Sequence, residues 1–281
     1  MSITVVTTFH KPGLDLYGQR FIDSFQENVD PRVKLFVYAE DCDPVIENTD
    51  QITVLDATQT LPKLNAFKSK WKDVPKANGK CPPEIKAKRP RDWHKEFKWD
   101  AVRFSNKVYA VFDACYKAPS KWVVWIDADT YFHSKLSYDE FVDLLPNNNW
   151  LTYVGRGKGA STWPECGFYG MNLDDPACKS FLEDFETMYE NAERGIFALE
   201  EWHDSYVFGH ILNRYKKDFP HVLDYTADMM LKTALTGGGG HPLINTVLGK
   251  YMDHLKGGRK KLGKSQKKDL VIKRKEKWWK Q

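Results

Sequence analysis

The sequence predicts an α/β fold, with a mixed and mostly parallel sheet flanked by helices. A β-branched run at residues 3–9 (ITVVTTF), a helical spacing of apolar residues over 17–27 and a second β-branched run at 33–39 follow one another. This order favours a right-handed strand–helix–strand unit with parallel strands. A third run at 122–126 (WVVWI) is apolar at every position, which is typical of a strand buried at the centre of a sheet.

The composition is that of a folded globular protein and excludes a disordered one. Apolar residues make up 42% of the 281 residues and aromatic residues 14%, and the formal net charge is +4. The five cysteines contain no C-x-x-C pair, which argues against a disulfide framework and a thiolate zinc site. No apolar run reaches the roughly 20 residues of a membrane helix, and the first residues lack signal-peptide features. We therefore expect a soluble, cytoplasmic protein.

The rest of the chain continues the alternation of strands and helices. Five prolines among many lysines at 61–91 predict a long surface excursion that cannot be regular throughout. Apolar residues recur at intervals of three and four over 93–116, which predicts a long amphipathic helix on the sheet. The remaining expected elements are strands at 52–55 and 150–154 and helices at 138–145, 176–191 and 200–215.

Positive charge is concentrated at the C-terminal end. Residues 256–281 carry 12 Lys and Arg against 2 Asp and Glu, a sum of +10 that leaves −6 for residues 1–255. We expect a domain over 1–255 and a basic tail over 256–281, whose start belongs to the active site. The tail is either a solvated, solubilising segment or a polyanion contact, with Trp278 and Trp279 stacking on bases or seated at a membrane interface.

Two aspartates, Asp127 and Asp129, directly follow the apolar strand at 122–126. Ligands of open α/β sheets bind outside the carboxyl ends of the strands, so the position suits a site. Both carboxylates can reach one hard cation, Mg²⁺ or Mn²⁺, which substrate phosphates often help to coordinate. The alternative is that one aspartate caps a following helix and the other is solvated.

The apolar run with its D-x-D, WVVWIDADTYF at 122–132, resembles the signature of nucleotide-sugar-dependent glycosyltransferases of the GT-A fold, which is Rossmann-like. Residues 254–260 (HLKGGRK) fit H-x-x-G-x-x-K, a pattern near the C-terminus of glycogenin-like retaining enzymes. The resemblance implies that His254 is the third metal ligand and that Gly257 and Lys260 hold the donor diphosphate. The chemistry agrees, since imidazole can ligate Mn²⁺ and Lys neutralises a leaving diphosphate.

Two observations qualify this metal site. His241, which follows GGGG and precedes Pro242, competes with His254 as the third ligand. The aromatic residue that usually follows the lysine in this family is absent, because Lys261 and Leu262 stand there.

The segment 163–172 (WPECGFYGMN) is similar to the part of GT-A enzymes that passes beneath the donor sugar and meets the acceptor. Its glycines, Gly167 and Gly170, would allow close packing under a sugar, and Glu165 could bond sugar hydroxyls. Phe168 or Tyr169 could stack on the sugar face. The alternative is a β-turn with core aromatics.

The string WHDS at 202–205 looks like one in the blood-group-transferase-like retaining family. Asp204 is therefore our leading candidate for the acid that orients the acceptor or stabilises oxocarbenium charge, with Glu201 and Glu165 as reserves. Capping of a helix by acids near its N-terminus is the alternative. His203 is expected to lie on the helix surface or to form a hydrogen bond rather than act as a base.

The resemblance also places the nucleotide. The strand end with Thr7, Thr8 and Phe9 occupies the place where base and ribose bind in this fold. Arg103 and Lys107, one turn apart on the helix before the D-x-D, are expected to reach the diphosphate or uracil, the alternative being a solvated helix face.

Together these features predict a metal-dependent hexosyltransferase with a UDP-sugar donor, Mn²⁺ or Mg²⁺ as cofactor, and retention of configuration. If the reaction instead inverts, Asp204 or Glu165 would serve as general base. The acceptor would be a glycan, a glycolipid or a hydroxylated nucleic acid. Two other functions remain open: a metal-dependent nucleotidyltransferase, and a nucleic-acid-binding protein that acts through its basic tail.

Overall fold

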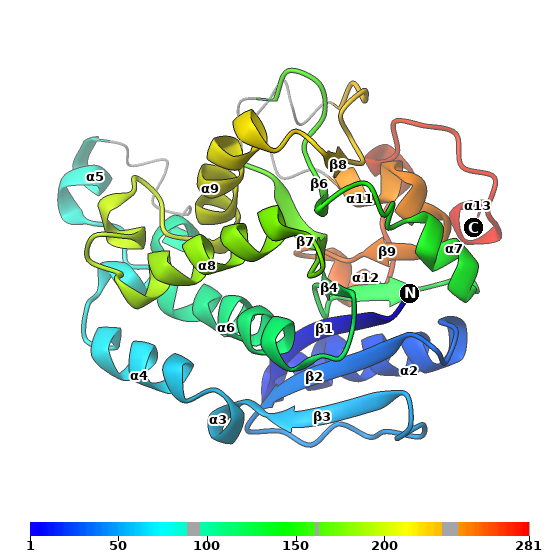
Figure 1. The fold of residues 1–281 in the computed structure, drawn as a ribbon, viewed down its shortest axis with the longest axis horizontal. Helices are drawn as coiled ribbons and strands as arrows, with labels where there is room; N and C mark the ends of the chain where they lie inside the picture. Colours follow the sequence, from blue (N-terminus) through cyan, green and yellow to red (C-terminus); the bar gives the residue numbers. More distant parts are fainter. Residues whose placement is uncertain (89–95, 161–162, 232–240, 281) are drawn as a thin grey trace.

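A sheet of seven strands forms the centre of the computed structural model, which describes residues 1–88, 96–160, 163–231 and 241–280. Its strand order is β3-β2-β1-β4-β7-β6-β8 (Figure 1). The first four of these strands are parallel: β1 (Ile3–His10), β2 (Lys34–Glu40), β3 (Ile52–Asp56) and β4 (Trp122–Ile126). The predicted α/β class, central strand and strand–helix–strand opening are confirmed.

The other half of the sheet is mixed. Strand β7 (Glu165–Asn172) runs antiparallel to both β4 and β6 (Leu151–Val154), and β8 (Val222–Asp224) runs parallel to β6. The turn that we considered for 163–172 is wrong, because all eight residues of β7 are buried inside the sheet. Strand β8 was not predicted, since three residues are too few to show an alternating pattern.

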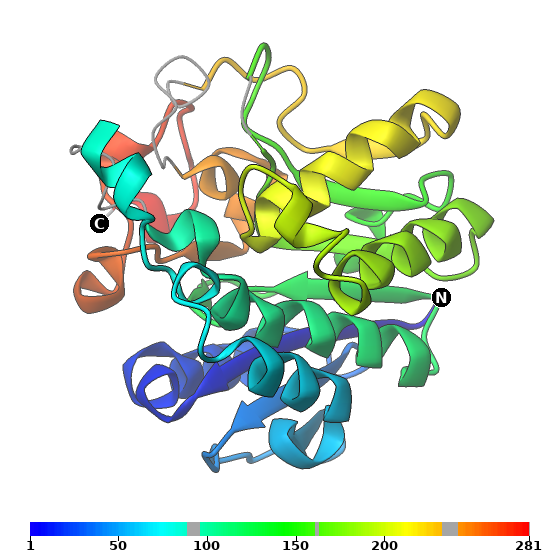
Figure 2. The ribbon, with the colours of Figure 1, turned by 90° about the vertical axis from the view of Figure 1, so that its left-hand side faces the viewer.

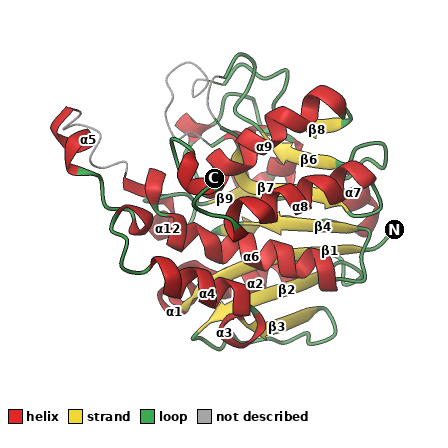
Figure 3. Cartoon of the chain, turned by 60° about the vertical axis from the view of Figure 1, so that its left-hand side comes forward, coloured by secondary structure: helices red, strands yellow, loops and turns green. Residues whose placement is uncertain are grey.

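Helices cover both faces of the sheet, with α6 and α8 on one side and α2 and α7 on the other (Figure 1). Figure 3 shows α6, α8 and α9 in front of the strands. In the described part of the chain, the helices of four or more residues outside the C-terminal segment are α2 (Gln19–Asn28), α3 (Ala57–Thr60), α4 (Pro62–Trp71), α5 (Pro83–Lys88), α6 (Ala101–Lys117), α7 (Tyr138–Asp143), α8 (Pro176–Glu190), α9 (Asp204–Asp218) and α11 (Pro242–Asn245). Shorter or tighter turns are α1 (Lys11–Gly13), η1 (Leu14–Gly18), η2 (Lys76–Asn78), η4 (Ile196–Ala198) and η5 (Val247–Lys250).

The helices differ from expectation in three places. The 61–91 segment is more helical than predicted, because Pro62 and Pro83 stand at helix starts, where a missing N–H is tolerated. The helix predicted over 93–116 begins at Ala101, and residues 93–95 lie outside the described part of the chain. The helix predicted from residue 200 begins at Asp204.

Two apolar cores pack against the two faces of the sheet, because successive strand residues point to opposite sides. On β1, Val6 joins the core beneath α6, α8 and α9, whereas Val5 joins the core beneath α2 and α7. Both faces of β4 are therefore covered, and all five of its side chains are buried. Only the ends of this strand are left for polar chemistry.

A second, two-stranded sheet extends the structure beyond the carboxyl end of β4. It pairs β5 (Thr130–Phe132) with β9 (Met252–His254) in antiparallel register, so that Thr130 lies opposite His254. Neither strand was predicted from the sequence. The pairing brings the C-terminal part of the chain to the D-x-D.

The C-terminal segment folds back onto the domain instead of extending into solvent. It contains α12 (Arg259–Leu262), η6 (Lys267–Asp269) and α13 (Lys277–Lys280). In Figure 2 its orange and red residues lie at the end of the sheet opposite the N-terminus. Trp279 is 5% exposed, and its indole N–H donates to the Gly249 carbonyl at 2.8 Å. The alternative that the basic tail contacts a polyanion has no support in these contacts. None of the described helices is long and apolar enough to cross a membrane.

We expect the substitution Trp279→Ala to lower the free energy of unfolding by about 3 kcal/mol, because it empties a buried site and leaves a carbonyl without its donor. Urea denaturation followed by circular dichroism measures this loss. Ile272→Ala, at a side chain that is 38% exposed in the same segment, is the control and should change stability by less than about 0.5 kcal/mol. Equal effects of the two substitutions would contradict the docking of the segment.

Candidate active site

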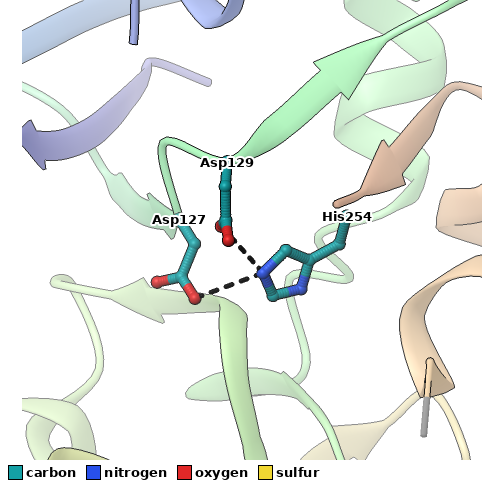
Figure 4. Close-up of side chains that lie close together, drawn as sticks. All are labelled: Asp127, Asp129 and His254. Atoms are coloured by element: carbon teal, nitrogen blue, oxygen red, sulfur yellow. Dashed lines mark hydrogen bonds and ion pairs between the residues drawn. The ribbon is translucent and has the colours of Figure 1, made fainter. Parts of the chain in front are cut away.

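Asp127 and Asp129 lie in the turn that joins β4 to β5. The Asp127 N–H donates to the Gly167 carbonyl at 2.9 Å, and the Thr130 N–H donates to the Asp127 carbonyl at 3.0 Å. This tight turn directs the two carboxylates toward the same region (Figure 4). The D-x-D therefore occupies the carboxyl end of the central strand, as its place in the sequence predicted.

His254 completes a cluster with these aspartates. Its Nε2 lies 3.0 Å from Asp129 Oδ1 and 3.4 Å from Asp127 Oδ2 (Figure 4). The three ligand atoms lie within 4.8 Å of one another. The competing His241 does not join this cluster, and its Nδ1 instead lies 3.2 Å from the His254 carbonyl oxygen.

The electrostatics of the cluster suit a divalent cation. Burial alone would lower the pKa of His254, but the adjacent Asp129 and Asp127 carboxylates outweigh it and raise this pKa to about 9. Burial would raise the pKa of Asp127, whereas Lys107 and His254 hold it well below its usual range. The two aspartates are thus anionic, and a proton on His254 balances them. Two carboxylate oxygens and one imidazole are a donor set that fits Mn²⁺, which could replace that proton.

Glu165 stands behind His254, at the start of β7. It is almost fully buried and pairs with Lys256, with Arg156 at 3.4 Å, and with His254 Nδ1 at 3.8 Å. Burial would raise its pKa, but Lys256, His254 and Arg156 lower it to about 2. Glu165 thus faces the second ring nitrogen of His254, which leaves Nε2 directed at the aspartates.

The other residues expected to meet the sugar are part of the protein core. Phe168 and Tyr169 are buried, so neither can stack on a sugar. A side chain at Gly167 would collide with the His254 ring, and one at Gly170 would crowd Leu145. The glycine at 167 therefore makes room for His254, not for the donor.

Lys107 bridges two acids inside the protein. Its Nζ lies 3.0 Å from Asp127 Oδ1 and 2.8 Å from Asp204 Oδ2, and it also donates to the Cys166 carbonyl. Burial would lower its pKa, but Asp127 and Asp204 raise it well above the ordinary value. The solvated helix face considered for Lys107 is wrong. A direct contact of its ammonium with diphosphate would require breaking these pairs.

A cavity of about 450 Å³ opens beside the cluster. Eight of the residues proposed from the sequence line it: Thr8, Arg103, Lys107, Asp127, Asp129, Glu165, Asp204 and Lys260. Lys260 Nζ lies 3.1 Å from Asp129 Oδ2, and Asp204 is the first residue of α9. Arg103 is largely exposed and pairs with Asp100 at 3.0 Å. The volume lies within the usual range for small-molecule sites.

Several proposed residues lie outside this cavity. The side chains of Thr7 and Phe9 are buried within the protein, so only Thr8 of that strand end lines the cavity. Glu201 is buried against Lys98 and lies 3.0 Å from His203 Nε2. His203, by contrast, lines the cavity, and it is buried and hydrogen-bonded to Glu201 rather than lying on the helix surface.

Gly257 does not line the cavity either, but its backbone is unusual. Its φ of 59° lies in the left-handed region that favours glycine, and no atom lies within 4 Å of where a side chain would begin. The open space leaves its backbone accessible, as the proposed diphosphate contact requires.

Sequence reasoning missed other residues that line the cavity, among them Tyr17, Trp125, Arg156 and Lys256. Tyr17 lies on the π-helical turn η1, and Lys260 Nζ stands 4.5 Å from the centre of its ring. Lys256 lies within the H-x-x-G-x-x-K segment, so that motif contained a signal for it. Trp125 belongs to the apolar run before the D-x-D, whereas Tyr17 and Arg156 lie in segments with no motif of their own.

Comparisons with known proteins found similarity in structure alone. No family model matches this chain, and no curated protein matches it. The apo structure of the WbbM bifunctional glycosyltransferase is 14% identical, with a TM-score of 0.43, over 79% of this chain and 38% of that one. The glycosyltransferase GlyE of Streptococcus pneumoniae TIGR4 is 11% identical, with a TM-score of 0.41, over 80% of this chain and 45% of that one. This chain therefore spans less than half the length of either protein.

We expect Lys107→Met to lower the free energy of unfolding by about 3 kcal/mol at pH 7, because it leaves the partly buried Asp127 and the buried Asp204 without their shared cation. The loss should shrink as the pH falls below about 4, because protonation of Asp127, whose pKa Lys107 helps to hold well below its usual range, removes the charge that the lysine stabilises. Urea denaturation at pH 7 and at about pH 3 measures both effects. Lys117→Met removes an exposed lysine paired with Asp113 and should cost less than about 1 kcal/mol at either pH. A loss for Lys107→Met that is independent of pH would contradict the charge bridge.

Proposed function

We propose that this protein is a metal-dependent glycosyltransferase that takes a hexose from a UDP-linked donor and retains the configuration at the anomeric carbon. One observation carries the proposal: Asp127, Asp129 and His254 come together beside a cavity that Lys260 also lines. A nucleotide sugar offers a diphosphate to such a site, and the motifs of the sequence resemble those of enzymes that use this donor.

The metal site is proposed to consist of Asp127, Asp129 and His254, with Mn²⁺ or Mg²⁺ as the cofactor. When bound there, the cation would neutralise the diphosphate as it leaves. Glu165 orients His254 from behind, and Lys107 fixes Asp127 from the side. These residues hold the ligands in place before substrate arrives, which limits reorganisation during the reaction.

Lys260 and Lys256 are proposed to bind the donor phosphates. Both now pair with carboxylates of the site, Asp129 and Glu165, and both line the cavity. Phosphate oxygens can take over these ion pairs once a cation neutralises the aspartates. Thr8, Tyr17 and Arg103 line the same cavity and are the proposed contacts for the nucleoside.

Asp204 is the proposed acid at the reacting carbon. The bond between the anomeric carbon and the diphosphate oxygen breaks, a bond to the acceptor oxygen forms, and the hydroxyl proton leaves with the nucleoside diphosphate. Lys107 holds Asp204 in the wall of the cavity, where its carboxylate can stabilise positive charge on the sugar. Glu165, whose pKa is about 2, would be a poor general base, which agrees with retention.

The first test is a thermal-shift panel of UDP, GDP, CDP, ADP and their sugar conjugates, each with Mn²⁺, Mg²⁺ or EDTA. We expect UDP and one UDP-sugar to raise the melting temperature by several degrees with Mn²⁺ and not with EDTA, because a ligand of the folded state stabilises it by mass action. Asp127→Asn should abolish this shift while the protein stays folded. A metal-dependent shift that survives in Asp127→Asn would contradict the proposed site.

The phosphate role of Lys260 has a neighbouring control. We expect Lys260→Ala to weaken binding of Mn²⁺-UDP about tenfold, because it removes the cation beside Asp129. Lys261→Ala changes the next residue, which is exposed and does not line the cavity, and should leave the dissociation constant within about twofold. Isothermal titration calorimetry decides between them. Equal losses would mean that only overall charge matters.

A further inference from the structure

A buried carboxylate links the C-terminal segment to the proposed phosphate-binding lysines. Asp253 precedes His254 on β9 and is fully buried. Neighbouring residues of a strand point to opposite sides, so Asp253 faces away from the metal cluster. It accepts three hydrogen bonds: from the Ser265 N–H at 2.8 Å, from the Ser265 hydroxyl at 2.6 Å and from the Trp278 indole at 3.3 Å.

These bonds close the loop formed by residues 255–264, which we call the lysine loop. It begins after His254, contains Lys256, Lys260 and α12, and ends just before Ser265. The bonds between Asp253 and Ser265 therefore join its two ends. Within the loop, Lys256 and Lys260 line the cavity.

Two further contacts hold the lysine loop against the domain. Arg259 pairs with Asp269, with its Nε 2.8 Å from Asp269 Oδ2, and Arg20 donates to the Gly263 carbonyl at 2.6 Å. Gly257 and Gly263 both have positive φ, so the loop turns sharply at each of them. None of the residues in these two contacts lines the cavity, so the loop is also held at positions away from the candidate site.

The part of the chain that supplies Ser265 and Trp278 is itself anchored. Trp278 stacks on His133, with ring centres 5.2 Å apart, and Arg274 donates to the Thr246 carbonyl at 2.8 Å. The Val271 N–H donates to the Asn245 side chain at 2.8 Å. The basic C-terminal segment is therefore packed on the domain in a defined position, and we call its part over residues 265–280 the C-terminal brace.

We propose that Asp253 and Ser265 are positioning residues: together with the docked C-terminal segment, they hold the lysine loop so that Lys256 and Lys260 meet the diphosphate of the donor. The inference rests on the proposed function for the identity of the ligand. A free lysine loses side-chain entropy when it binds phosphate, and a preorganised loop loses less. Loosening the loop should therefore weaken phosphate binding and leave the metal ligands, which β5–β9 pairing holds, in place.

The test is isothermal titration calorimetry of Mn²⁺ alone and of pyrophosphate in the presence of Mn²⁺. We expect Ser265→Ala to weaken pyrophosphate binding about tenfold and to change Mn²⁺ binding by less than about twofold. Ser265→Thr keeps the hydroxyl and should restore binding. Asp253→Asn should repeat the loss. Thr226→Ala, the control, removes a buried hydroxyl bonded to Asp224 at 2.8 Å; Thr226 does not line the cavity, so this change should not affect pyrophosphate binding.

A double-mutant cycle separates positioning from general destabilisation. If Ser265 acts through Lys260, Ser265→Ala should weaken pyrophosphate binding much less in a Lys260→Ala background than in the wild type. Unchanged binding in Ser265→Ala, or a full and additive loss in the double variant, would overturn the inference while leaving the proposed function standing. If the pyrophosphate results are as expected but the protein binds and uses no nucleotide sugar, the inference stands and the proposed function is overturned. Failure of the wild type to bind pyrophosphate would overturn both.

Discussion

The balance of buried charge at the carboxyl end of β4 governs the structure around the candidate site. Four carboxylates, those of Asp127, Asp129, Glu165 and Asp204, meet at one cavity, where unpaired charges would be costly. Lys107, His254, Lys256 and Lys260 each neutralise at least one of them. All three lysines line the cavity, but Lys107 is buried, whereas Lys256 and Lys260 are partly exposed. The site thus combines the buried ion pairs of Lys107 with two lysines, Lys256 and Lys260, that the proposed function assigns to phosphate binding.

This balance explains why distant parts of the chain converge. The central strand supplies two acids, α6 supplies Lys107, β7 supplies Glu165 and α9 begins with Asp204. The last contribution, from β9 and the lysine loop, depends on pairing with β5 and on the C-terminal brace. The same segment that makes the sequence basic at its end therefore completes the site.

Sequence patterns predicted the parts of the fold that local chemistry dictates. The apolar run of β4, the helical stripe that became α6 and the D-x-D all have periodicities or positions that survive in the structure. The three-residue strands β5, β8 and β9 have no such pattern, because long-range pairing defines them. The sequence also did not predict which polar positions are buried. Lys107 has the spacing of a surface lysine in its helix, but it is buried between two acids. Gly167 was expected to contact a sugar, but the His254 ring packs against it. The H-x-x-G-x-x-K motif led to the expectation that His254 lies beside the aspartates, and it does. The distance of more than 120 residues along the chain gives no sign of this contact, whereas the motif does.

The most direct test of the account is electron paramagnetic resonance of the protein with one equivalent of Mn²⁺ and UDP. We predict hyperfine coupling to one histidine nitrogen and to phosphorus, with the nitrogen coupling lost in His254→Gln. Such a spectrum would show the cation held between His254 and the diphosphate. A bound Mn²⁺ with no nitrogen coupling, or one whose nitrogen coupling persists in His254→Gln, would contradict the metal site on which the proposed function rests.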